Sequence, residues 1–337
     1  MLTESDLKLL DALQTDPRAS WSVVGRALGI GAVTAARRWD QLSARGQAWL
    51  TAYPGGDLLA TMALAFVELD CAPGESLRVA HELARDAHVP TVEYLAGPCD
   101  LHLHLMAPTL RDLSDYVQHR LSRRPGVARI RTVVSPRLFT EGSRWRVRAI
   151  SPGEREVLVG RPGRSTAPLR FTDLDRSLAL ALGEDVRASA ASLASRLEVS
   201  ATTVRRRLDI LLAHGAIRLR CEIARPLSPA PVTAMLWLRV PPDTLETTAR
   251  SLATLPEVRM CAATSSDANL MVVVWLGSHH EATALEAGLS EKLPWLQVVN
   301  RATTLRTIKL MGHLIDEAGH TEGLVPLDFW APVKPLG

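Results

Sequence analysis

The chain has few cysteines and no long apolar run, and each shortage excludes a class of protein. Its cysteines, Cys71, Cys99, Cys221 and Cys261, are scattered through 337 residues, which excludes a disulfide scaffold and the closely spaced pairs of a zinc site. No apolar run approaches the roughly 20 residues of a membrane span, and "MVVVWLG" is short enough to be a buried strand. The acidic start, "MLTESDLKLLDALQ", lacks the apolar core of a signal peptide. These shortages predict a cytoplasmic protein with reduced thiols and no membrane partner.

A large net charge is also missing. The formal net charge is only +3, so any affinity for nucleic acid has to come from local patches and not from a polycationic chain. Hydrophobic residues make up 47% of the chain, which is enough for well-formed cores. At about 150 residues per domain, the length predicts two to four domains.

The sequence contains an internal repeat. The segment "TESDLKLLDALQTDPRAS" at 3–20 aligns with "TDLDRSLALALGEDVRAS" at 172–189, an offset of 169 residues. The same offset carries Arg18 to Arg187 and, far downstream, Pro125 to Pro294. One ungapped shift over about 140 residues indicates a tandem duplication of a unit too long for a solenoid repeat.

Each copy has two parts, and a basic segment joins the copies. A helical pattern comes first, and alternating strand-like and helix-like runs follow it. The predicted boundaries are 1–52 and 58–140 in copy one, a linker at 141–170, 171–224 and 230–314 in copy two, and a C-terminal tail at 315–337. The linker is rich in Arg, Pro and Gly and is interpreted as solvated, with a short helix after Ser151-Pro152. The arginines of the linker could also contact DNA phosphates. In the tail, Phe329 and Trp330 are predicted to dock on a neighbour.

The first part of copy two predicts a helix-turn-helix. "LDRSLALALGED" and "SAASLASRLEVS" give two helices, and a third helix runs from residue 201 to about 214. Ser200 stands where an N-cap belongs, and Gly215 fits a C-terminal cap. Two short helices around a tight turn, with the first helix packed behind them, form a helix-turn-helix. "AIRLRCEI" is then a β-wing strand.

The third helix has one apolar side, formed by Val204, Leu208 and Leu211. The side chains opposite that stripe, which include Arg206, have no packing role and are free to enter a major groove, where Arg can bind guanine and Thr can bond to bases. Arg205 suits a phosphate. Arg207, near the apolar edge, either braces the domain or reaches a phosphate. The predicted DNA-contacting residues of this copy are Ser200, Thr202, Thr203, Arg205, Arg206 and Arg207. A merely solvated charged face is the alternative interpretation.

Copy one predicts a weaker DNA-reading helix, "GIGAVTAARRWDQLSARG". Gly31 replaces the capping serine, which costs only a few tenths of a kcal/mol, so the helix should survive. Ala35-Ala36 stands where copy two has Val204-Arg205, which removes one potential phosphate contact and lowers the expected salt dependence. The predicted contacts are Thr34, Arg37 and Arg38.

The second part of each copy predicts a β-α-β-β-α-β order. In copy one the runs are "MALAFVELD", "ESLRVAHELARD", "PTVEYLAG", "DLHLHLMA", "TLRDLSDYVQHRLSRRPGV" and "ARIRTVVSPRLF". Copy two repeats them from "AMLWLRV" to "VVNRATTLRTIKL". This is the split βαβ, ferredoxin-like plan.

A winged helix-turn-helix followed by a small ferredoxin-like domain resembles the Lrp/AsnC (leucine-responsive regulatory protein) family of bacterial and archaeal transcription regulators. The resemblance rests on "VSATTVRRRLDILLAHGAI", "HVPTVEYLAGPCDLHLHL" and, more loosely, "LPEVRMCAATSSDANLMVVV". Ordinary members have one copy, so this chain resembles two members fused. The implied fold class is α+β, with two winged helix-turn-helix domains, each followed by a ferredoxin-like βαββαβ domain.

The resemblance also implies that the ferredoxin-like domains pair through their sheets and bind a small effector, often an amino acid, in clefts between them. It assigns the effector turn to Gly97, Pro98, Cys99 and Asp100 in copy one, and to Ser265, Ser266, Asp267 and Asn269 in copy two. Turn amides and a carboxylate could hold an ammonium or carboxylate group. Copy two has Ser266 for the turn glycine and Asn269 for the acid, so its pocket is altered or lost. An ordinary β-turn, with glycine for positive φ, is the alternative.

Signs of an enzyme are weak. His102 and His104 share a strand face and could bind a metal with a third ligand, but without a supporting motif they are interpreted as strand-surface histidines. "GRPGRST" lacks the lysine of a phosphate loop, and no nucleophile-elbow serine is present. Sirohaem decarboxylases share the two-domain architecture, but their Tyr, Arg and His pattern after the "PEV" segment is not matched by "PEVRMCAATSSDAN".

We therefore predict a sequence-specific DNA-binding transcriptional regulator that is not an enzyme and needs no cofactor or metal. Its predicted partners are double-stranded DNA, a small effector that modulates DNA binding, and further copies of the chain. A sirohaem decarboxylase-like enzyme is the alternative function.

Overall fold

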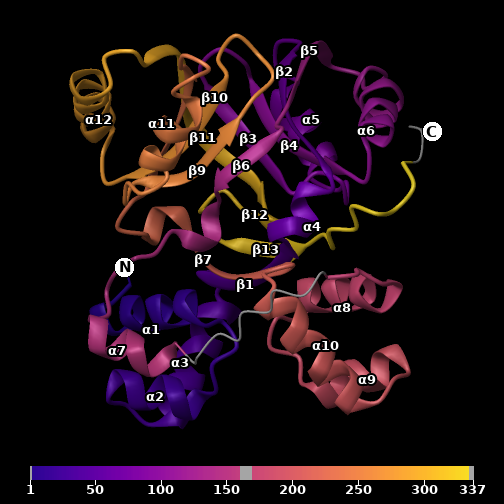
Figure 1. The fold of residues 1–337 in the computed structure, drawn as a ribbon, viewed down its shortest axis with the longest axis vertical. Helices are drawn as coiled ribbons and strands as arrows, with labels where there is room; N and C mark the ends of the chain where they lie inside the picture. The colour runs from indigo at the N-terminus through magenta and orange to yellow at the C-terminus, as the bar shows by residue number, and fades with distance from the viewer. Residues whose placement is uncertain (1, 160–168, 334–337) are drawn as a thin grey trace. The chain divides into compact units, whose positions relative to one another are not determined.

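The computed structural model describes residues 2–159 and 169–333, which form two compact units. Unit 1 comprises Met1–Thr61, Arg146–Leu227 and His320–Leu327, and unit 2 comprises Met62–Trp145, Ser228–Gly319 and Asp328–Gly337. Both helical parts of the repeat belong to unit 1, and both strand-rich parts belong to unit 2 (Figure 1). The "GRPGRST" stretch at 160–166 and the last four residues of the tail lie outside the described residues.

Unit 1 contains the two predicted helix-turn-helix motifs. In copy one the helices are α1 (Glu4–Thr15), α2 (Trp21–Leu28) and α3 (Ala32–Ala44), and in copy two they are α8 (Asp173–Glu184), α9 (Ala190–Leu197) and α10 (Ala201–Ala213). Capping boxes at Thr3 and Thr172 satisfy backbone N–H groups at the starts of α1 and α8. Serines cap α2, α9 and α10. The starts of the first two helices therefore follow from local capping chemistry that both copies share.

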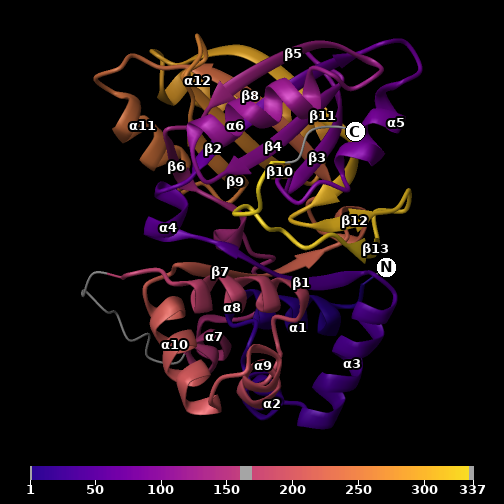
Figure 2. The same ribbon diagram turned by 90° about the vertical axis from the view of Figure 1, so that its right-hand side faces the viewer.

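The wing strands pair between the copies. Strand β1 (Ala48–Pro54) and strand β7 (Ile217–Ile223) form an antiparallel two-stranded sheet (Figure 2). Helix α1 packs on β7 and helix α8 packs on β1, so each strand contacts the helices of the other copy. Cys221 and Ile223 of β7 accordingly belong to the hydrophobic core of copy one. The "AIRLRCEI" segment is a strand as predicted, but it completes the other copy's domain.

The described part of the linker in unit 1 is packed, so the prediction of a solvated linker is wrong there. The predicted short helix exists as α7 (Pro152–Leu158), capped by Ser151. Ile150 and Leu158 are buried in the copy-one core. The Ile150 N–H donates to the buried Asp11 carboxylate (2.9 Å), and the Val147 N–H donates to Gln14 (2.9 Å). The prediction considered only the basic composition of the segment. Its apolar residues Ile150 and Leu158 lie between the arginines and pack into the core.

Unit 2 contains the two predicted ferredoxin-like domains. Copy one supplies β2 (Ala63–Cys71), α5 (Ser76–Leu83), β3 (Thr91–Ala96), β4 (Leu101–Ala107), α6 (Leu110–Tyr116), which continues as a π-helical turn at Val117–Leu121, and β5 (Val127–Val134). Copy two supplies β8 (Val232–Arg239), α11 (Leu245–Leu252), β9 (Val258–Ala263), β10 (Leu270–Leu276), α12 (His279–Lys292) and β11 (Gln297–Leu310). The strand orders β5-β2-β4-β3 and β11-β8-β10-β9 are the same arrangement twice, which confirms the α+β fold class.

Two strands join the ferredoxin-like domains into one sheet. The first half of β11 pairs with β8, and its second half pairs with β3 of copy one. Strand β6 (Arg137–Thr140), which follows β5 after two residues, pairs with β9 of copy two. The strand path therefore leaves copy one through β3 and returns to it through β6. The two ferredoxin-like domains of the chain are therefore joined by backbone pairing between their strands.

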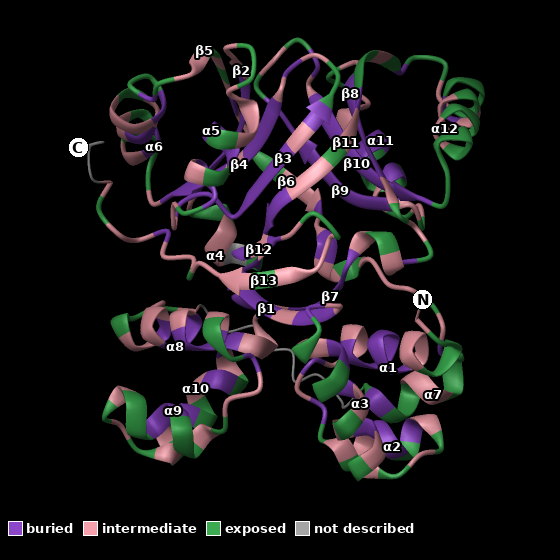
Figure 3. Cartoon of the chain, turned by 180° about the vertical axis from the view of Figure 1, so that it is seen from behind, coloured by how far each residue is buried: buried purple, intermediate pink, exposed green. Residues whose placement is uncertain are grey.

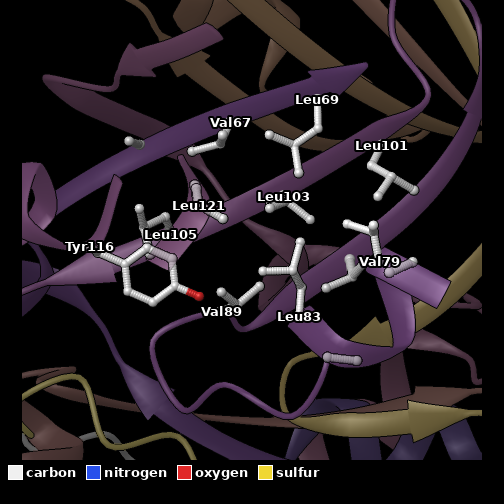
Figure 4. Packing of buried hydrophobic residues seen from close by; sticks show 14 of the residues in the cluster. Val67, Leu69, Val79, Leu83, Val89, Leu101, Leu103, Leu105, Tyr116 and Leu121 are labelled. Atoms are coloured by element: carbon white, nitrogen blue, oxygen red, sulfur yellow. The ribbon is translucent and has the colours of Figure 1, made fainter. Parts of the chain in front are cut away.

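Each domain of unit 2 has a helix-covered face with an apolar core. In copy one, alternate residues of β2 and β4 pack against α5 and α6 around Tyr116 (Figure 4). The corresponding core of copy two lies under α11 and α12. The central strands β2, β4, β8 and β10 are largely buried, whereas α12 is mostly exposed and buries only Leu289 (Figure 3). These central strands are buried on both faces of the sheet. The face opposite the helices, called the inner face below, must therefore be covered as well.

The tail packs on its own chain. Phe329 is completely buried, and the backbone carbonyl of Ala331 lies 2.9 Å from Nε2 of His88 in copy one. The docking predicted for Phe329 is therefore internal to unit 2. Among the residues that the structure describes, no helix is long and apolar enough to cross a membrane.

Candidate functional site

Helix α10 presents a polar face opposite a buried stripe. Val204 and Leu211 are fully buried and Leu208 is 5% exposed, so these residues anchor the helix to its domain. The Ser200 hydroxyl accepts a hydrogen bond from the Thr203 N–H (3.1 Å) and fixes the first turn. On the other side, the exposed side chains are Ser200, Thr202, Arg205, Arg206 and Asp209, with Thr203 half-buried. This is the orientation that a helix needs in order to read a DNA groove.

Arg207, the third arginine of the run, is used inside the domain. It forms a bidentate ion pair with Asp175 of α8, whose carboxylate is fully buried, and also donates to the Arg170 carbonyl (2.6 Å). Burial acts to raise the pKa of Asp175, but hydrogen bonds from Arg207 and Thr172 outweigh it and lower that pKa. Of the two roles open to Arg207, the geometry favours bracing.

Helix α3 repeats this plan with fewer polar groups. Ala35, Trp39 and Leu42 are its buried residues. Thr34 is half-buried and Arg37 is exposed. At the N-cap, Gly31 makes no side-chain hydrogen bond.

Two further α3 positions differ in their chemistry or contacts from their equivalents in α10. Arg38 lies 3.6 Å from Asp6 of α1, the position equivalent to the Arg207–Asp175 pair. Val33, at the position of Thr202, is 82% exposed. Copy one therefore offers Arg37 and an apolar contact where copy two offers two arginines and a threonine.

A reciprocal pair of arginines joins the two helical domains of unit 1. Arg18 donates to the carbonyls of Val186 and Ala188 in copy two. Its repeat equivalent, Arg187, donates to the carbonyls of Pro17 (2.7 Å) and Ala19 (2.8 Å) in copy one. The repeat offset marked these arginines as equivalent, but only the tertiary contact reveals the clamp. With the β1–β7 sheet, it fixes the placement of α3 relative to α10 within unit 1.

The predicted effector turns lie at equivalent strand ends, where their acid and amide are structural. The Asp100 carboxylate accepts from the Cys71 N–H (2.7 Å). Asn269, its repeat equivalent, accepts from the Val240 N–H (2.9 Å) and donates to the Val240 carbonyl (2.8 Å). The Asn269 amide is therefore bonded to the backbone at the end of β8. It replaces the hydrogen bond of Asp100 with an uncharged group.

The remaining turn residues also have protein partners. Gly97 does not have positive φ. A side chain there would place Cβ 2.5 Å from the Cβ of Ala302 in β11, so glycine is required by close approach and the positive-φ alternative is wrong. Ser265 accepts from the Val134 N–H (3.1 Å), Ser266 donates to the Ala268 carbonyl (2.9 Å), and the Asp267 carbonyl accepts from Arg239 (3.1 Å). Copy two's turn is thus bonded to itself and to copy one.

Beside the copy-one turn lies a small cavity of about 10 Å³, lined by Glu68, Asp70, Pro98, Cys99, Arg129 and Arg131. This is room for about one water molecule. Arg131 is paired with Glu68, and Arg129 lies 3.5 Å from Asp70. Burial raises the pKa of the Cys99 thiol to about 12, so Cys99 stays protonated. The cavity has carboxylates that could bind the ammonium group of an amino acid and guanidinium groups that could bind its carboxylate. In this structure they pair with one another.

A larger cavity of about 120 Å³ lies in copy two between α12 and the sheet, next to Ala96 of copy one. Its lining is mostly apolar, and Glu286 and Arg301 form an ion pair (2.9 Å) within it. Sequence reasoning did not identify this cavity, because it depends on how loosely α12 covers the sheet.

The histidines of β4 contradict the prediction of strand-surface side chains. His102 is fully buried on the inner face of the sheet, and His104 is half-buried beside it. Burial lowers the pKa of His102 to about 4, so this ring is neutral at pH 7. Copy two covers this face through Trp237, whose ring meets His102 edge-on. Alternation predicted a shared face but could not show that the other copy would cover it.

Comparisons with known proteins agree with this arrangement. The model of the AsnC-type helix-turn-helix domain matches residues 2–43 and 171–212, and the model of the Lrp/AsnC ligand binding domain matches residues 64–144. An HTH-type transcriptional regulator of Pyrococcus furiosus is 25% identical over 150 residues, which are 43% of this chain and 96% of that protein. A regulator of Pyrococcus horikoshii is 23% identical over 149 residues, covering 43% and 89%.

The solved structure of the siroheme decarboxylase NirDL with an iron-uroporphyrin III analogue is similar over both units. It aligns with a TM-score of 0.56 and 17% identity, covering 92% of this chain and 93% of that chain. At this identity the likeness shows the fold. The helix-turn-helix domain found twice, the ligand-binding domain and the regulator relatives together show that this chain belongs to the Lrp/AsnC family, as a tandem fusion of two copies.

Proposed function

We propose that the chain is a sequence-specific DNA-binding transcription regulator whose affinity for DNA is modulated by a small effector. The observation that supports this most directly is the exposed face of α10, where Thr202, Arg205 and Arg206 stand opposite a fully buried anchor. None of these three side chains has a packing role in its domain. Arginine and threonine are suited to base edges and phosphates in a major groove.

The helix-turn-helix domains of the two copies, called the heads below, should contribute unequally to DNA binding. Helix α10 has two exposed arginines, Arg205 and Arg206, whereas α3 has one, Arg37. We assign Arg206 to a base edge, Arg205 to a phosphate, and Arg38 and Arg207 to bracing. Exposed Val33 suits the methyl group of a thymine. Such a pair fits an asymmetric operator with one strong and one weak half-site.

Fluorescence anisotropy with DNA from the chain's own promoter region tests this proposal. Arg206→Ala should weaken specific binding by about 1–3 kcal/mol and relax the preference at one base pair. Arg205→Ala should weaken binding to all sequences and reduce the salt slope by about one. Arg250→Ala is the matched control, because it removes an exposed arginine of unit 2 that pairs only locally with Glu246. If Arg206→Ala binds like Arg250→Ala, the assignment of α10 is wrong.

We place the effector at the copy-one turn, beside Pro98 and Cys99. The carboxylates of Glu68 and Asp70 suit an ammonium group, and Arg129 and Arg131 suit a carboxylate, so an amino acid matches the charges of this cavity. The cavity must open to admit it, which requires exchange of the Arg131–Glu68 and Arg129–Asp70 pairs. An effector changes DNA affinity only by its differential affinity for the two states of the protein. Calorimetry with an amino-acid panel, with Arg131→Gln as the binding-deficient variant, tests this site.

A siroheme decarboxylase-like activity is the second candidate, because the NirDL fold matches both units. It predicts binding of an iron tetrapyrrole, which is visible as a Soret band when an iron-uroporphyrin III analogue is added. A stoichiometric spectral shift with loss of carboxyl groups from the pigment favours the enzyme. Specific promoter binding without such a shift favours the regulator.

A further inference from the structure

The inner face of the copy-one sheet brings together three metal-ligating side chains. Strands β3 and β4 are antiparallel, and their register sets Glu93 directly opposite His102. His104 lies two residues along β4 and therefore on the same face. One ligand atom from each of Glu93, His102 and His104 can be chosen so that all three lie within 4.8 Å of one another.

Among the residues that the structure describes, three of the four histidine nitrogens in this cluster have no hydrogen-bond partner. Both Nδ1 and Nε2 of His102 are buried without a partner, and so is Nε2 of His104. Buried polar atoms are nearly always hydrogen-bonded, and an orphaned nitrogen needs an explanation. Imidazole nitrogens are also the commonest protein ligands of transition metals. His104 keeps some exposed surface, which gives an ion a route to the cluster.

The repeat shows that these residues are not needed to build the sheet. The offset of 169 places Ala262, Met271 and Val273 at the equivalent positions of copy two. All three are buried in strands β9 and β10, which have the same places in the fold as β3 and β4. The same backbone is thus packed with apolar side chains in one copy and with a carboxylate and two imidazoles in the other.

We propose that Glu93, His102 and His104 bind one divalent first-row transition metal ion, such as Zn²⁺ or Fe²⁺. Two imidazoles and one carboxylate are the ligands of catalytic zinc sites and of non-haem iron sites. Three protein ligands leave at least one coordination position for water or a small molecule. Imidazole ligands disfavour Ca²⁺ and Mg²⁺, which prefer oxygen.

The surroundings of Glu93 both support and oppose this site. The Thr304 hydroxyl of copy two donates to Glu93 Oε1 (3.3 Å), as expected for a ligand oriented by an outer partner. The guanidinium of Arg259, which lies over the Trp275 ring (4.3 Å), acts electrostatically on Glu93 and His104 and competes with a bound cation. Arg259→Gln should therefore tighten metal binding.

Titration of the untagged, chelator-treated full-length chain with Co²⁺ tests the proposal without DNA. We expect visible ligand-field bands that saturate at one Co²⁺ per chain. Glu93→Gln and His104→Gln should weaken binding at least about tenfold. The matched control, His279→Gln/His280→Gln, removes the exposed histidine pair at the start of α12 and should bind like wild type.

Two results would overturn the site: no stoichiometric bands in the wild-type chain, or bands that disappear only in the His279/His280 variant. Because fully buried His102 is a risky target for substitution, Cu²⁺ electron paramagnetic resonance of the wild-type chain is the second measurement. It should show hyperfine coupling from two imidazole nitrogens, and a spectrum without nitrogen coupling also rejects the proposal. Circular dichroism of each variant separates lost ligation from lost folding.

Discussion

Adjacent arginines of α10 have different roles because the helix turns by 100° per residue. Arg206 is exposed, whereas Arg207 points to the first helix and pairs with buried Asp175. The sequence placed Arg207 near the boundary of the two faces, and a carboxylate on another helix decides its role. The Arg38–Asp6 pair is the looser equivalent in copy one, because Asp6 is 19% exposed.

Arg207→Ala should lower the free energy of unfolding of the copy-two head by about 3 kcal/mol, because it leaves a buried carboxylate without its partner. Arg38→Ala should cost less than about 1 kcal/mol, since its pair is longer and partly solvated. Urea unfolding followed by far-UV circular dichroism measures both. Equal effects would show that Asp175 finds another partner.

Lys309, on β11, is a buried cation in unit 2. Its Nζ donates to the Asp86 carbonyl (2.8 Å), and burial lowers its pKa to about 7, against the opposing charge of Asp86. In the unfolded chain the pKa of this lysine is about 10.4, so the unfolded state binds the proton more tightly than the folded state does. The free energy of unfolding should therefore rise with pH between about 7 and 10.

Lys309→Met should remove this pH-dependent contribution and stabilise unit 2 most at or below pH 7. The measurement is the difference in urea-unfolding free energy between the variant and wild type at pH 6.5 and at pH 9.5 (about the ends of that range). Subtraction cancels the other titrating groups. A difference that does not shrink at the higher pH contradicts the assignment.

At the scale of elements, the wings distinguish unit 1 from two separate domains. Because β1 and β7 pair with each other and pack on the opposite copy's helices, neither helical domain has a complete core alone. Gly46, which links α3 to β1, has φ +64° and accepts a hydrogen bond from the Thr321 N–H (2.9 Å). The turn between helix and wing is therefore in contact with the segment at His320–Leu327.

Gly46→Ala and Gly29→Ala form a matched pair. Both glycines have nearly the same positive φ, but an added Cβ meets nothing at Gly29 and approaches the Thr321 carbonyl oxygen to 2.3 Å at Gly46. Gly29→Ala should cost about 1 kcal/mol from backbone strain, and Gly46→Ala should cost a further 1–3 kcal/mol or so from the clash. Thermal unfolding compares them. Similar melting temperatures would mean that the Thr321 segment moves freely away.

At the scale of the whole molecule, one chain carries both halves of what a dimer would supply. The strand path through β11 and β6 joins the ferredoxin-like domains, and the β1–β7 sheet with Arg18 and Arg187 joins the heads. The spacing of α3 and α10 is therefore a property of unit 1. The predicted self-association into larger assemblies remains a prediction, for which the solution mass is the test.

A fixed spacing between heads predicts sensitivity to operator geometry. Inserting about five base pairs between the half-sites turns one half-site to the opposite side of the DNA and should reduce affinity to that of a single head. The double variant Arg18→Ala/Arg187→Ala loosens the clamp and should reduce this penalty. Anisotropy with the original and lengthened operators measures it, and equal affinities would show that the heads move independently.

The duplicated plan can be read from the sequence alone, because caps, apolar periods and the 169-residue offset are local or linear properties of the chain. The sequence also identified the exposed face of α10, since a helical wheel separates a packed stripe from its opposite side. Four features depend on long-range packing and are visible only in the folded chain. They are the exchange of the wings, the reciprocal hydrogen bonds of Arg18 and Arg187, the packing of α7 and the burial of His102. Alternation shows which residues share a face. What covers that face depends on surfaces far away in the sequence, and so does the meeting of Glu93, His102 and His104.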